Sequence, residues 1–289
     1  MTLTYHHVEV FSPVPFGGNS LPVFPDAGGD LTAAQMLTIT QELRHFEAIF
    51  LQPTSRPWTV DARIFDLFEE LPFAGHPIIG AAAVLHRCAD TDGAQTWRFQ
   101  LLSKTVEVTT ERHGGHYTGW LDQGRPEFLG TVDDRATFAG AFSLRQADLD
   151  TDLPMEVVST GLRYLIVPVR SGALAKARIA HDITDVLHAV DAQFAVLFDE
   201  AGVEIRHWNN DGVVEDVATG SAAGTIGAYR LRHELVGGGE QFTLNQGQYT
   251  GRPSRLRVRP EGRGNAVHAV HVGGDVSFVG HGVIEAVPA

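Results

Sequence analysis

Two stretches of small residues, separated by 145 positions, constrain the fold of this chain more than any other feature. Ala74–Arg87 and Thr219–Arg232 each lead from a glycine-containing loop into a segment rich in Gly and Ala. The offset, 219 − 74 = 145, is about half of the 289 residues. A helix that is apolar almost all round is buried on every side. The weak repeat therefore predicts two similar domains, each wrapping strands around one central helix.

Alternating apolar and polar residues, bounded by turn residues, predict strands in both halves. The first half also predicts a helix over 32–43, where Thr32 and Gln35 have the spacing of a capping box. The interval 126–152 is expected to hold loop and helix. The expected strands are 6–11, 21–24, 46–51, 62–65, 97–102, 106–110, 117–121, 155–159, 164–169, 194–198, 203–207, 242–245, 255–259, 266–272 and 276–279.

Composition excludes several classes of function. Lys plus Arg total 22 and Asp plus Glu total 35, a net charge of −13, so a nucleic acid is not expected as a partner. Cys88 is the single cysteine, which excludes an internal disulfide and any mechanism that needs two thiols. The first ten residues lack the basic and apolar regions of a signal peptide, and no apolar run approaches ~20 residues. We expect a cytoplasmic protein without a membrane partner.

Both small-residue helices begin at a glycine, which predicts two anion sites. The first-turn N–H groups of a helix have no partner inside the helix, and the helix dipole places partial positive charge there. Gly75-His76 and Gly220-Ser221 would let a small carboxylate approach the backbone closely. In the alternative interpretation, these glycines only permit tight turns and close packing.

Three side chains near these helices are candidates for moving protons: Glu47, His76 and Asp216. Glu47 stands among apolar neighbours, and an apolar wall raises the pKa of a carboxyl group toward the working pH of a general base. Each candidate also has a structural interpretation. Strand alternation would turn Glu47 to solvent, His76 would make a local hydrogen bond, and Asp216 would be a loop or cap residue.

Other motifs do not support a cofactor or a metal. Residues 220–227 do not match the Gly-x-Gly-x-x-Gly fingerprint, and the chain has neither a phosphate-binding P-loop nor a Gly-x-Ser-x-Gly elbow. The pairs His113/His116 and His268/His271 are spaced i, i+3, which places the two side chains of a strand on opposite faces. We therefore expect neither a metal site nor a dinucleotide-binding site.

Several longer motifs run from one end of the chain to the other. The two most specific are Pro-Phe-Ala-Gly-His-Pro at 72–77 and Glu-Asp-Val-Ala-Thr-Gly-Ser-Ala at 215–222. The remaining motifs are 8–11, 15–19, 46–50, 64–65, 70–71, 159–162, 246–247, 251–254 and 273–274. In these motifs the chain resembles the phenazine-biosynthesis PhzF-like isomerase family, which has the diaminopimelate epimerase fold.

The resemblance implies an α+β fold with two pseudo-symmetric domains and the active site between them. Each domain would be a curved mixed or antiparallel sheet wrapped around a central helix, as in diaminopimelate epimerase. The N-terminal domain is expected over 1–118, completed by a strand at 276–289, and the C-terminal domain over 119–275. The resemblance also suggests a homodimer.

The same resemblance implies roles for particular residues. Glu47 would carry a proton between two carbons of one substrate, and His76, Asp216 and Ser221 would complete the catalytic set. Substrate binding would use Asn19, Gly75, Thr219 and Gly220, with backbone N–H groups receiving a carboxylate. No cofactor is implied. Related epimerases have two facing cysteines where Ala74 and Thr219 stand here, so two-thiol epimerisation is excluded.

The sequence therefore predicts a cofactor-independent isomerase of secondary metabolism. It would move a proton and a double bond within a small unsaturated cyclic amino or hydroxy acid. One alternative is stereoinversion of an amino acid, with Asp216 as the second acid, and another is a non-catalytic protein that binds small acids. Three sites depart from the family pattern: Ser20 and Val217, where prolines are common, and Asp66-Leu67, where a Thr-Pro pair is common.

Overall fold

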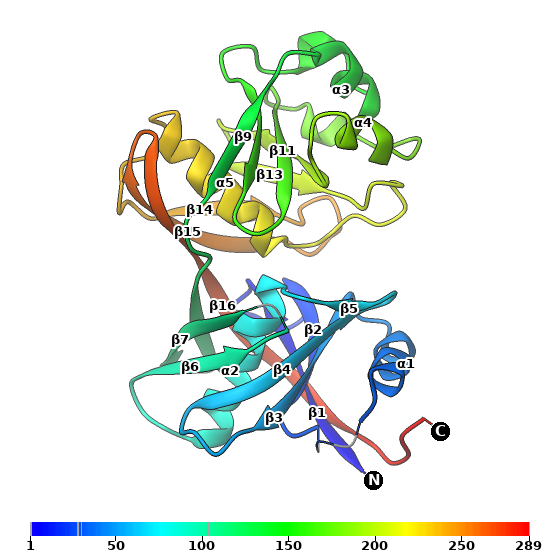
Figure 1. The fold of residues 1–289 in the computed structure, drawn as a ribbon, viewed down its shortest axis with the longest axis vertical. Helices are drawn as coiled ribbons and strands as arrows, with labels where there is room; N and C mark the ends of the chain where they lie inside the picture. The colour runs from blue at the N-terminus through cyan, green and yellow to red at the C-terminus, as the bar shows by residue number, and fades with distance from the viewer. Residues whose placement is uncertain (1, 28, 30, 103, 289) are drawn as a thin grey trace. The chain divides into compact units, whose positions relative to one another are not determined.

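The computed structural model describes residues 2–27, 29, 31–102 and 104–288. Its backbone contacts divide into two compact units (Figure 1). Unit 1 combines the residues up to Asp122 with those from Gly273 onward, and unit 2 is Gln123–Val272. The sequence analysis placed the two domain boundaries after residues 118 and 275.

Within the described ranges, unit 1 has two α-helices, and most of its strands come before residue 123. In order these are β1 (Leu3–Val10), β2 (Asn19–Phe24), α1 (Ala33–Leu43), β3 (Glu47–Pro53), β4 (Thr59–Asp66), β5 (Glu70–Leu71), α2 (Gly75–Ala89), β6 (Ala94–Gln100), β7 (Thr105–His113) and β8 (His116–Asp122).

Unit 2 holds the next elements, and its last strand continues into unit 1. They are β9 (Glu127–Val132), α3 (Arg135–Ala141), the 3-10 turn η1 (Gln146–Asp148), β10 (Met155–Ser159), β11 (Arg163–Pro168), η2 (Leu174–Lys176), α4 (Thr184–His188), β12 (Phe194–Asp199), β13 (Glu204–His207), α5 (Gly220–Arg232), β14 (Phe242–Gln246), β15 (Ser254–Arg263) and β16 (Ala266–Ile284).

The strands of unit 1 form a closed ring around α2. They follow the order β1-β2-β3-β4-β6-β7-β8-β16, and β16 pairs back onto β1. Every residue of α2 from Gly75 to Val84 is buried, and Figure 1 shows this helix within the strands. Gly80 allows the close fit, because a Cβ there would lie 2.6 Å from the Leu21 side chain and 2.9 Å from that of Val10.

Unit 2 repeats this arrangement around α5. Its strand order is β9-β10-β11-β12-β13-β14-β15-β16. The chain just before β9 also bonds to β16: Gln123 N donates to Val270 O at 2.9 Å, and Val270 N donates to Gly124 O at 3.2 Å. These two hydrogen bonds link the two ends of the strand series. Helix α5 is buried from Ala222 to Leu231.

Shorter helices cover the outside of each ring and bury a second apolar layer. In unit 1, Met36 and Ile39 of α1 pack into a cluster with Phe24, Phe50 and Phe65. In unit 2, α3, α4 and the 3-10 turn η2 contribute to a larger cluster whose buried members include Phe138, Phe142, Leu174, Leu187 and Trp208. The α+β class, with a mixed sheet around a central helix in each unit, confirms the predicted fold class.

Two element predictions were wrong. The interval 126–152 contains strand β9, which pairs antiparallel with β10, in addition to loop and helix. The expected strands 266–272 and 276–279 are parts of one strand, β16. Gly273 does not break it. A Cβ at Gly273 would lie 2.4 Å from Gly119 O, so the glycine permits the close approach of two strands.

Candidate active site

In unit 1, two predicted catalytic residues contact each other. Glu47 is the first residue of β3, and His76 is the second residue of α2. His76 Nδ1 lies 3.2 Å from Glu47 Oε2, and the two side chains are 8% and 18% exposed. Strand β3 therefore does not simply turn Glu47 out to solvent. The pair places an acid and an imidazole together where a proton can be taken up, held or passed on.

The helix start beside this pair has no side-chain cap. The residue before α2 is Ala74, which makes no side-chain cap, so the first-turn N–H groups of Gly75 and His76 receive no capping oxygen from it. Pro77 lies in the first turn, where its missing N–H removes no helical bond. Asn19, another predicted binding residue, begins β2 opposite Val10 and is buried.

In unit 2, the predicted residues form two hydrogen-bonded groups. Asp216 Oδ2 accepts from the Thr219 hydroxyl at 2.6 Å, and Asp216 Oδ1 accepts from Ala218 N at 3.3 Å. The Ser221 hydroxyl lies 2.8 Å from the Tyr164 hydroxyl. Gly220 begins α5, and Thr219 makes no side-chain cap there because its hydroxyl is engaged by Asp216.

A buried arginine anchors the loop that carries Asp216. The Arg206 guanidinium pairs with both carboxylate oxygens of Glu215, at 2.8 and 2.6 Å, and donates to Ala177 O at 3.1 Å. It also lies 4.3 Å from the ring centres of Trp208 and Tyr249. Such a bidentate pair fixes position as well as charge. This pair therefore holds the loop that carries Asp216 in one position.

His207 packs behind these residues. Its ring lies 5.4 Å from that of Tyr164, and its Nδ1 is 2.9 Å from Ala195 O. Because a carbonyl only accepts, Nδ1 carries the proton. Burial lowers the pKa of His207 below its ordinary value, and the charges of Asp216 and Glu215 oppose that shift. The ring is thus held in one tautomer against the loop.

Sequence reasoning missed Arg206, Gln246 and Tyr164 as part of these groups. Arg206 carries no motif, and its partner Glu215 is nine positions away. Gln246 belongs to a family motif, but only the folded chain shows that its amide contacts Asp216 and Thr219. In the sequence pattern, nothing distinguishes Tyr164 from other strand residues. The roles of the predicted residues in catalysis and binding remain predictions.

Metal ligation finds no support in the part of the chain that the structure describes, where no three His, Cys, Asp or Glu side chains gather as a metal-binding group. The interpretation of His113 and His116 was nevertheless wrong in one respect. They face each other across the turn between β7 and β8, with ring centres 5.9 Å apart, and do not lie on opposite faces of one strand.

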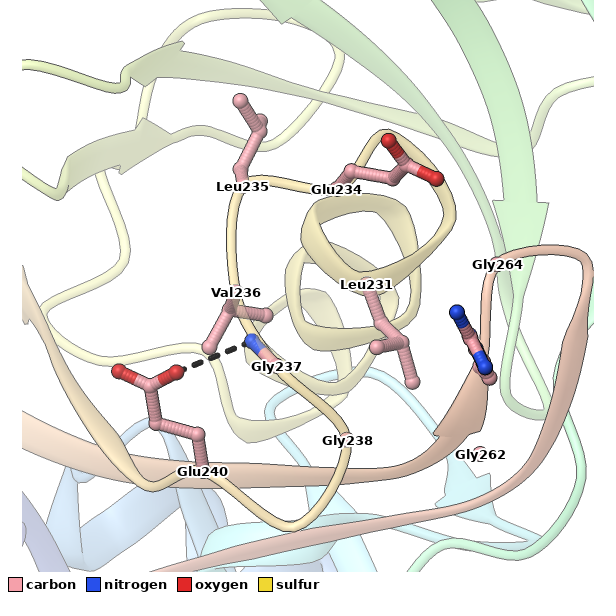
Figure 2. A pocket seen from close by; sticks show the side chains of 10 residues that line it. Leu231, Glu234, Leu235, Val236, Gly237, Gly238, Glu240, Gly262 and Gly264 are labelled. Carbon is pink, nitrogen blue, oxygen red and sulfur yellow. Dashed lines mark hydrogen bonds between the residues drawn. The ribbon is translucent and has the colours of Figure 1, made fainter.

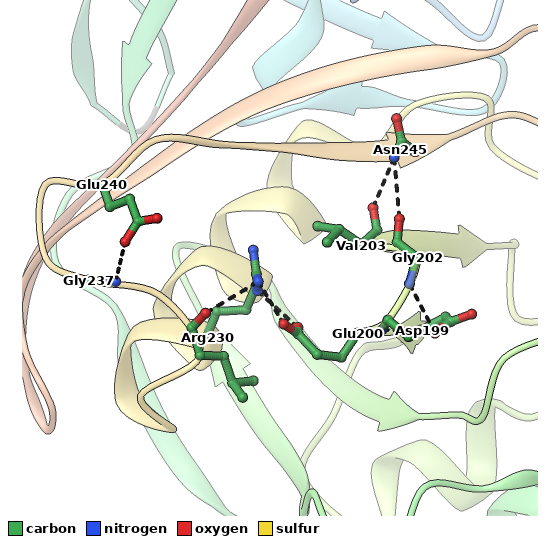
Figure 3. Close-up of polar contacts among 10 residues, drawn as sticks. Asp199, Glu200, Gly202, Val203, Arg230, Gly237, Glu240 and Asn245 are labelled. Atoms are coloured by element: carbon green, nitrogen blue, oxygen red, sulfur yellow. Dashed lines mark hydrogen bonds and ion pairs between the residues drawn. The ribbon is translucent and has the colours of Figure 1, made fainter.

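A hollow of about 610 Å³ lies at the C-terminal end of α5 (Figure 2). Thr219 and Ser221 lie at the opposite end of that helix. Glycines, apolar residues and charged residues of both signs line it, and Glu240 accepts from Gly237 N at 3.0 Å. Nearby, Arg230 pairs with Glu200 at 2.6 and 2.9 Å (Figure 3). None of the predicted site residues borders the hollow. These contacts secure the end of the helix, and we assign the hollow no ligand.

None of the helices in the described ranges combines the length and apolar character needed to cross a bilayer.

Comparison with known proteins gives consistent matches along the chain. The model of the phenazine biosynthesis-like protein family, PhzC-PhzF, matches residues 8–282. Trans-2,3-dihydro-3-hydroxyanthranilate isomerase of Pseudomonas aeruginosa is 32% identical over 286 residues, covering 94% of this chain and 95% of the relative.

Solved structures agree with this match. A Pseudomonas aeruginosa protein described as a predicted epimerase is 45% identical, with a TM-score of 0.92 and coverage of 98% of this chain and 99% of that one. A PhzF-family phenazine biosynthesis protein of Bacillus anthracis shares the fold at 20% identity, with a TM-score of 0.86 over 99% of this chain and 100% of that one.

Proposed function

This chain belongs to the phenazine biosynthesis-like (PhzC-PhzF) family, and from that premise we propose that it is an isomerase acting on a small unsaturated cyclic amino or hydroxy acid. The reaction moves one proton between two carbons and shifts the double bond, without a cofactor. Relatives from Pseudomonas species are named as isomerases of such a ring acid, trans-2,3-dihydro-3-hydroxyanthranilate. The observation that carries the proposal is the buried contact of His76 with Glu47.

Glu47 is the proposed proton carrier. Its carboxylate takes a proton from a ring carbon, and the electron pair of the broken C–H bond enters the conjugated system. The resulting carboxylic acid, whose proton can exchange with solvent, then delivers a proton to another carbon of that system. One group serves as base and then as acid, so the atoms balance without a second reagent. His76, 3.2 Å away, orients the Glu47 carboxylate and helps to relay the proton during the transfer.

Binding is assigned to backbone N–H groups and to polar side chains. The first turns of α2 and α5, at Gly75-His76 and Gly220-Ser221, begin without side-chain caps. Such N–H groups stabilise a carboxylate and the negative charge that develops on it. Asp216 and Ser221 hold the polar substituents of the ring, and Asn19 and Thr219 support the binding residues.

Stereoinversion is the second candidate, favoured by the description of a 45% identical protein as a predicted epimerase. It requires a second acid that donates a proton to the face opposite the base. Asp216 is the candidate for that acid, but its oxygens accept hydrogen bonds from Thr219 and Ala218. This arrangement fits an acceptor better than a donor, so we favour the double-bond shift.

The proposal also covers the location, oligomeric state and partners of the enzyme. We propose a cytoplasmic homodimer that serves a secondary-metabolic pathway and binds a carboxylate-bearing small molecule, with neither nucleic acid nor membrane as a partner. Light scattering of the purified protein measures the oligomeric state. A monomeric mass in solution would contradict that part of the proposal alone.

The test combines purified protein, D₂O and a panel of unsaturated cyclic amino and hydroxy acids, including trans-2,3-dihydro-3-hydroxyanthranilate. We expect carbon-bound deuterium and a new absorption band with the wild type, and neither with Glu47→Gln. Loss of optical rotation without a new band would indicate stereoinversion. Equal exchange in both proteins would remove Glu47 from the mechanism. Ligand-induced thermal stabilisation without exchange would indicate a binding protein.

A further inference from the structure

The Gln246 side chain connects the two residues that shape the Asp216 turn. Gln246 ends β14 and is 1% exposed. Its Oε1 accepts from Thr219 N at 2.8 Å, and its Nε2 donates to Asp216 O at 2.9 Å. Nε2 also lies 2.9 Å from the Thr219 hydroxyl oxygen. One buried amide therefore makes three hydrogen bonds within a turn of four residues.

The two backbone bonds fix which way the amide points. A peptide N–H can only donate and a peptide carbonyl can only accept. Oε1 must therefore face Thr219 N, and the NH₂ group must face Asp216 O. In the flipped amide, donor would meet donor and acceptor would meet acceptor at both backbone groups, leaving both unsatisfied in a buried place.

The fixed amide in turn fixes the direction of the Thr219 hydroxyl. The second N–H of Gln246 points at this oxygen, so the hydroxyl accepts on that side. A hydroxyl has a single proton, and the remaining partner of this one is Asp216 Oδ2 at 2.6 Å. Thr219 therefore donates to Asp216. With Ala218 N on Oδ1 at 3.3 Å, both carboxylate oxygens are held as acceptors.

We propose that Gln246 is a positioning residue for Asp216. Through the Thr219 hydroxyl, it fixes the rotation of the Asp216 carboxylate and keeps it an acceptor toward the donor group of a ligand. Arg206 and Glu215 fix the loop that carries Asp216. Gln246 and Thr219 fix the orientation of the Asp216 side chain. The geometry stands by itself, and only the effect on turnover rests on the proposed function.

Four variants test this chain of bonds. Thr219→Val removes the hydroxyl at nearly constant shape, and Thr219→Ser restores it. Gln246→Glu keeps the acceptor for Thr219 N but removes both N–H donors. Gln248→Glu adds the same charge to the exposed turn two residues further on and is the matched control. Thermal unfolding of each variant checks that it folds, and Thr219→Ala replaces Thr219→Val if the valine does not fit.

The primary measurement is a crystal structure of each folded variant. We expect the Asp216 carboxylate to rotate away from its wild-type place in Thr219→Val and Gln246→Glu, and to stay in place in Thr219→Ser and Gln248→Glu. An unmoved Asp216 carboxylate in both Thr219→Val and Gln246→Glu would overturn the inference. This result does not depend on any substrate. The crystal structures therefore test the positioning role of Gln246 even if the proposed function is wrong.

The second measurement is solvent-deuterium exchange into the best compound of the panel. A hydrogen bond to a charged group, once removed, corresponds to a loss of about 10- to 100-fold. We expect that loss in Thr219→Val and in Gln246→Glu, with most activity recovered in Thr219→Ser. Because both substitutions disturb one hydroxyl, the double variant should be no slower than the slower single variant. Independent, multiplying losses would contradict the linkage through Thr219.

Discussion

His76 Nδ1 contacts Glu47 Oε2 at 3.2 Å, which joins the first residue of a strand to the first turn of the central helix. The strand sets the place of the carboxylate, and the helix sets the place of the imidazole. Neither element can shift without breaking the contact. Unit 1 thus carries a preformed acid–imidazole pair on rigid elements, the arrangement that proton transfer requires.

The first prediction concerns that contact. His76→Asn keeps a polar group of similar reach but removes the imidazole, and we expect exchange to slow by about 10²-fold, since positioned acid–base groups contribute ~10²- to 10⁴-fold. The measurement is carbon-bound deuterium by NMR. Exchange at the wild-type rate in His76→Asn would show that His76 takes no part in the transfer.

The second prediction tests the packing of α2 inside its ring. A methyl group at Gly80 would meet Leu21 and Val10 at 2.6 and 2.9 Å, so Gly80→Ala should lower the free energy of unfolding by about 1–3 kcal/mol. Gly140 lies in helix α3 with open space around it. Gly140→Ala should raise that free energy by about 0.4–1 kcal/mol, since it restricts the unfolded chain. Urea unfolding of both variants is the check, and equal effects would contradict this account.

The third prediction separates a buried ion pair from an exposed one. Arg206 and Glu215 are 9% and 14% exposed, whereas Arg98 and Glu107 are 51% and 53% exposed. Arg206→Met leaves a buried carboxylate unpaired and should cost about 3–5 kcal/mol of unfolding free energy. Arg98→Met should cost at most about 1 kcal/mol. Replacing both Arg206 and Glu215 by Met should restore much of the loss, and a double variant as unstable as Arg206→Met would refute the explanation.

The fourth prediction concerns pH and His207. Burial lowers the pKa of His207 from 6.5 in the folded chain, so the unfolded chain binds more protons once the pH falls to about 6.5. This contribution to stability is therefore present above pH ~6.5 and is lost as the pH falls below it, by at most about 1.4 kcal/mol per pH unit. His207→Asn should flatten the fall in unfolding free energy between pH 7 and pH 5. A slope unchanged from the wild type would show that His207 does not contribute.

Local signals in the sequence were reliable wherever neighbours along the chain decide the structure. The capping box forms as predicted: Gln35 N donates to the Thr32 hydroxyl, and Thr32 N donates to the Gln35 side chain. Helix α2 and helix α5 begin at Gly75 and Gly220, as the glycine-led motifs indicate. Both central helices are buried, as an all-round apolar pattern requires.

The sequence was less informative where residues far apart in the chain decide the structure. The Gly-Gly pair at 273–274 resembles a break between two strands, and only the approach of Gly119 explains why the strand continues. Gln246 contacts Thr219 across 27 positions, and no pattern reports which amide atom faces which group. The motifs named the candidate residues, whereas the hydrogen bonds that orient them come from the fold.

Strand β16 has a consequence for the order in which the chain can fold during synthesis. Its residues 266–272 belong to unit 2 and its remainder to unit 1, where it pairs with both β1 and β8. Unit 2 is a continuous segment and can close as soon as Val272 has left the ribosome. Unit 1, although made first, must hold β1 and β8 as open edges until the last strand emerges, and open edges invite pairing with other chains. Strand β16 therefore joins strands that precede all of unit 2, and β1 and β8 lack this partner until β16 has been made.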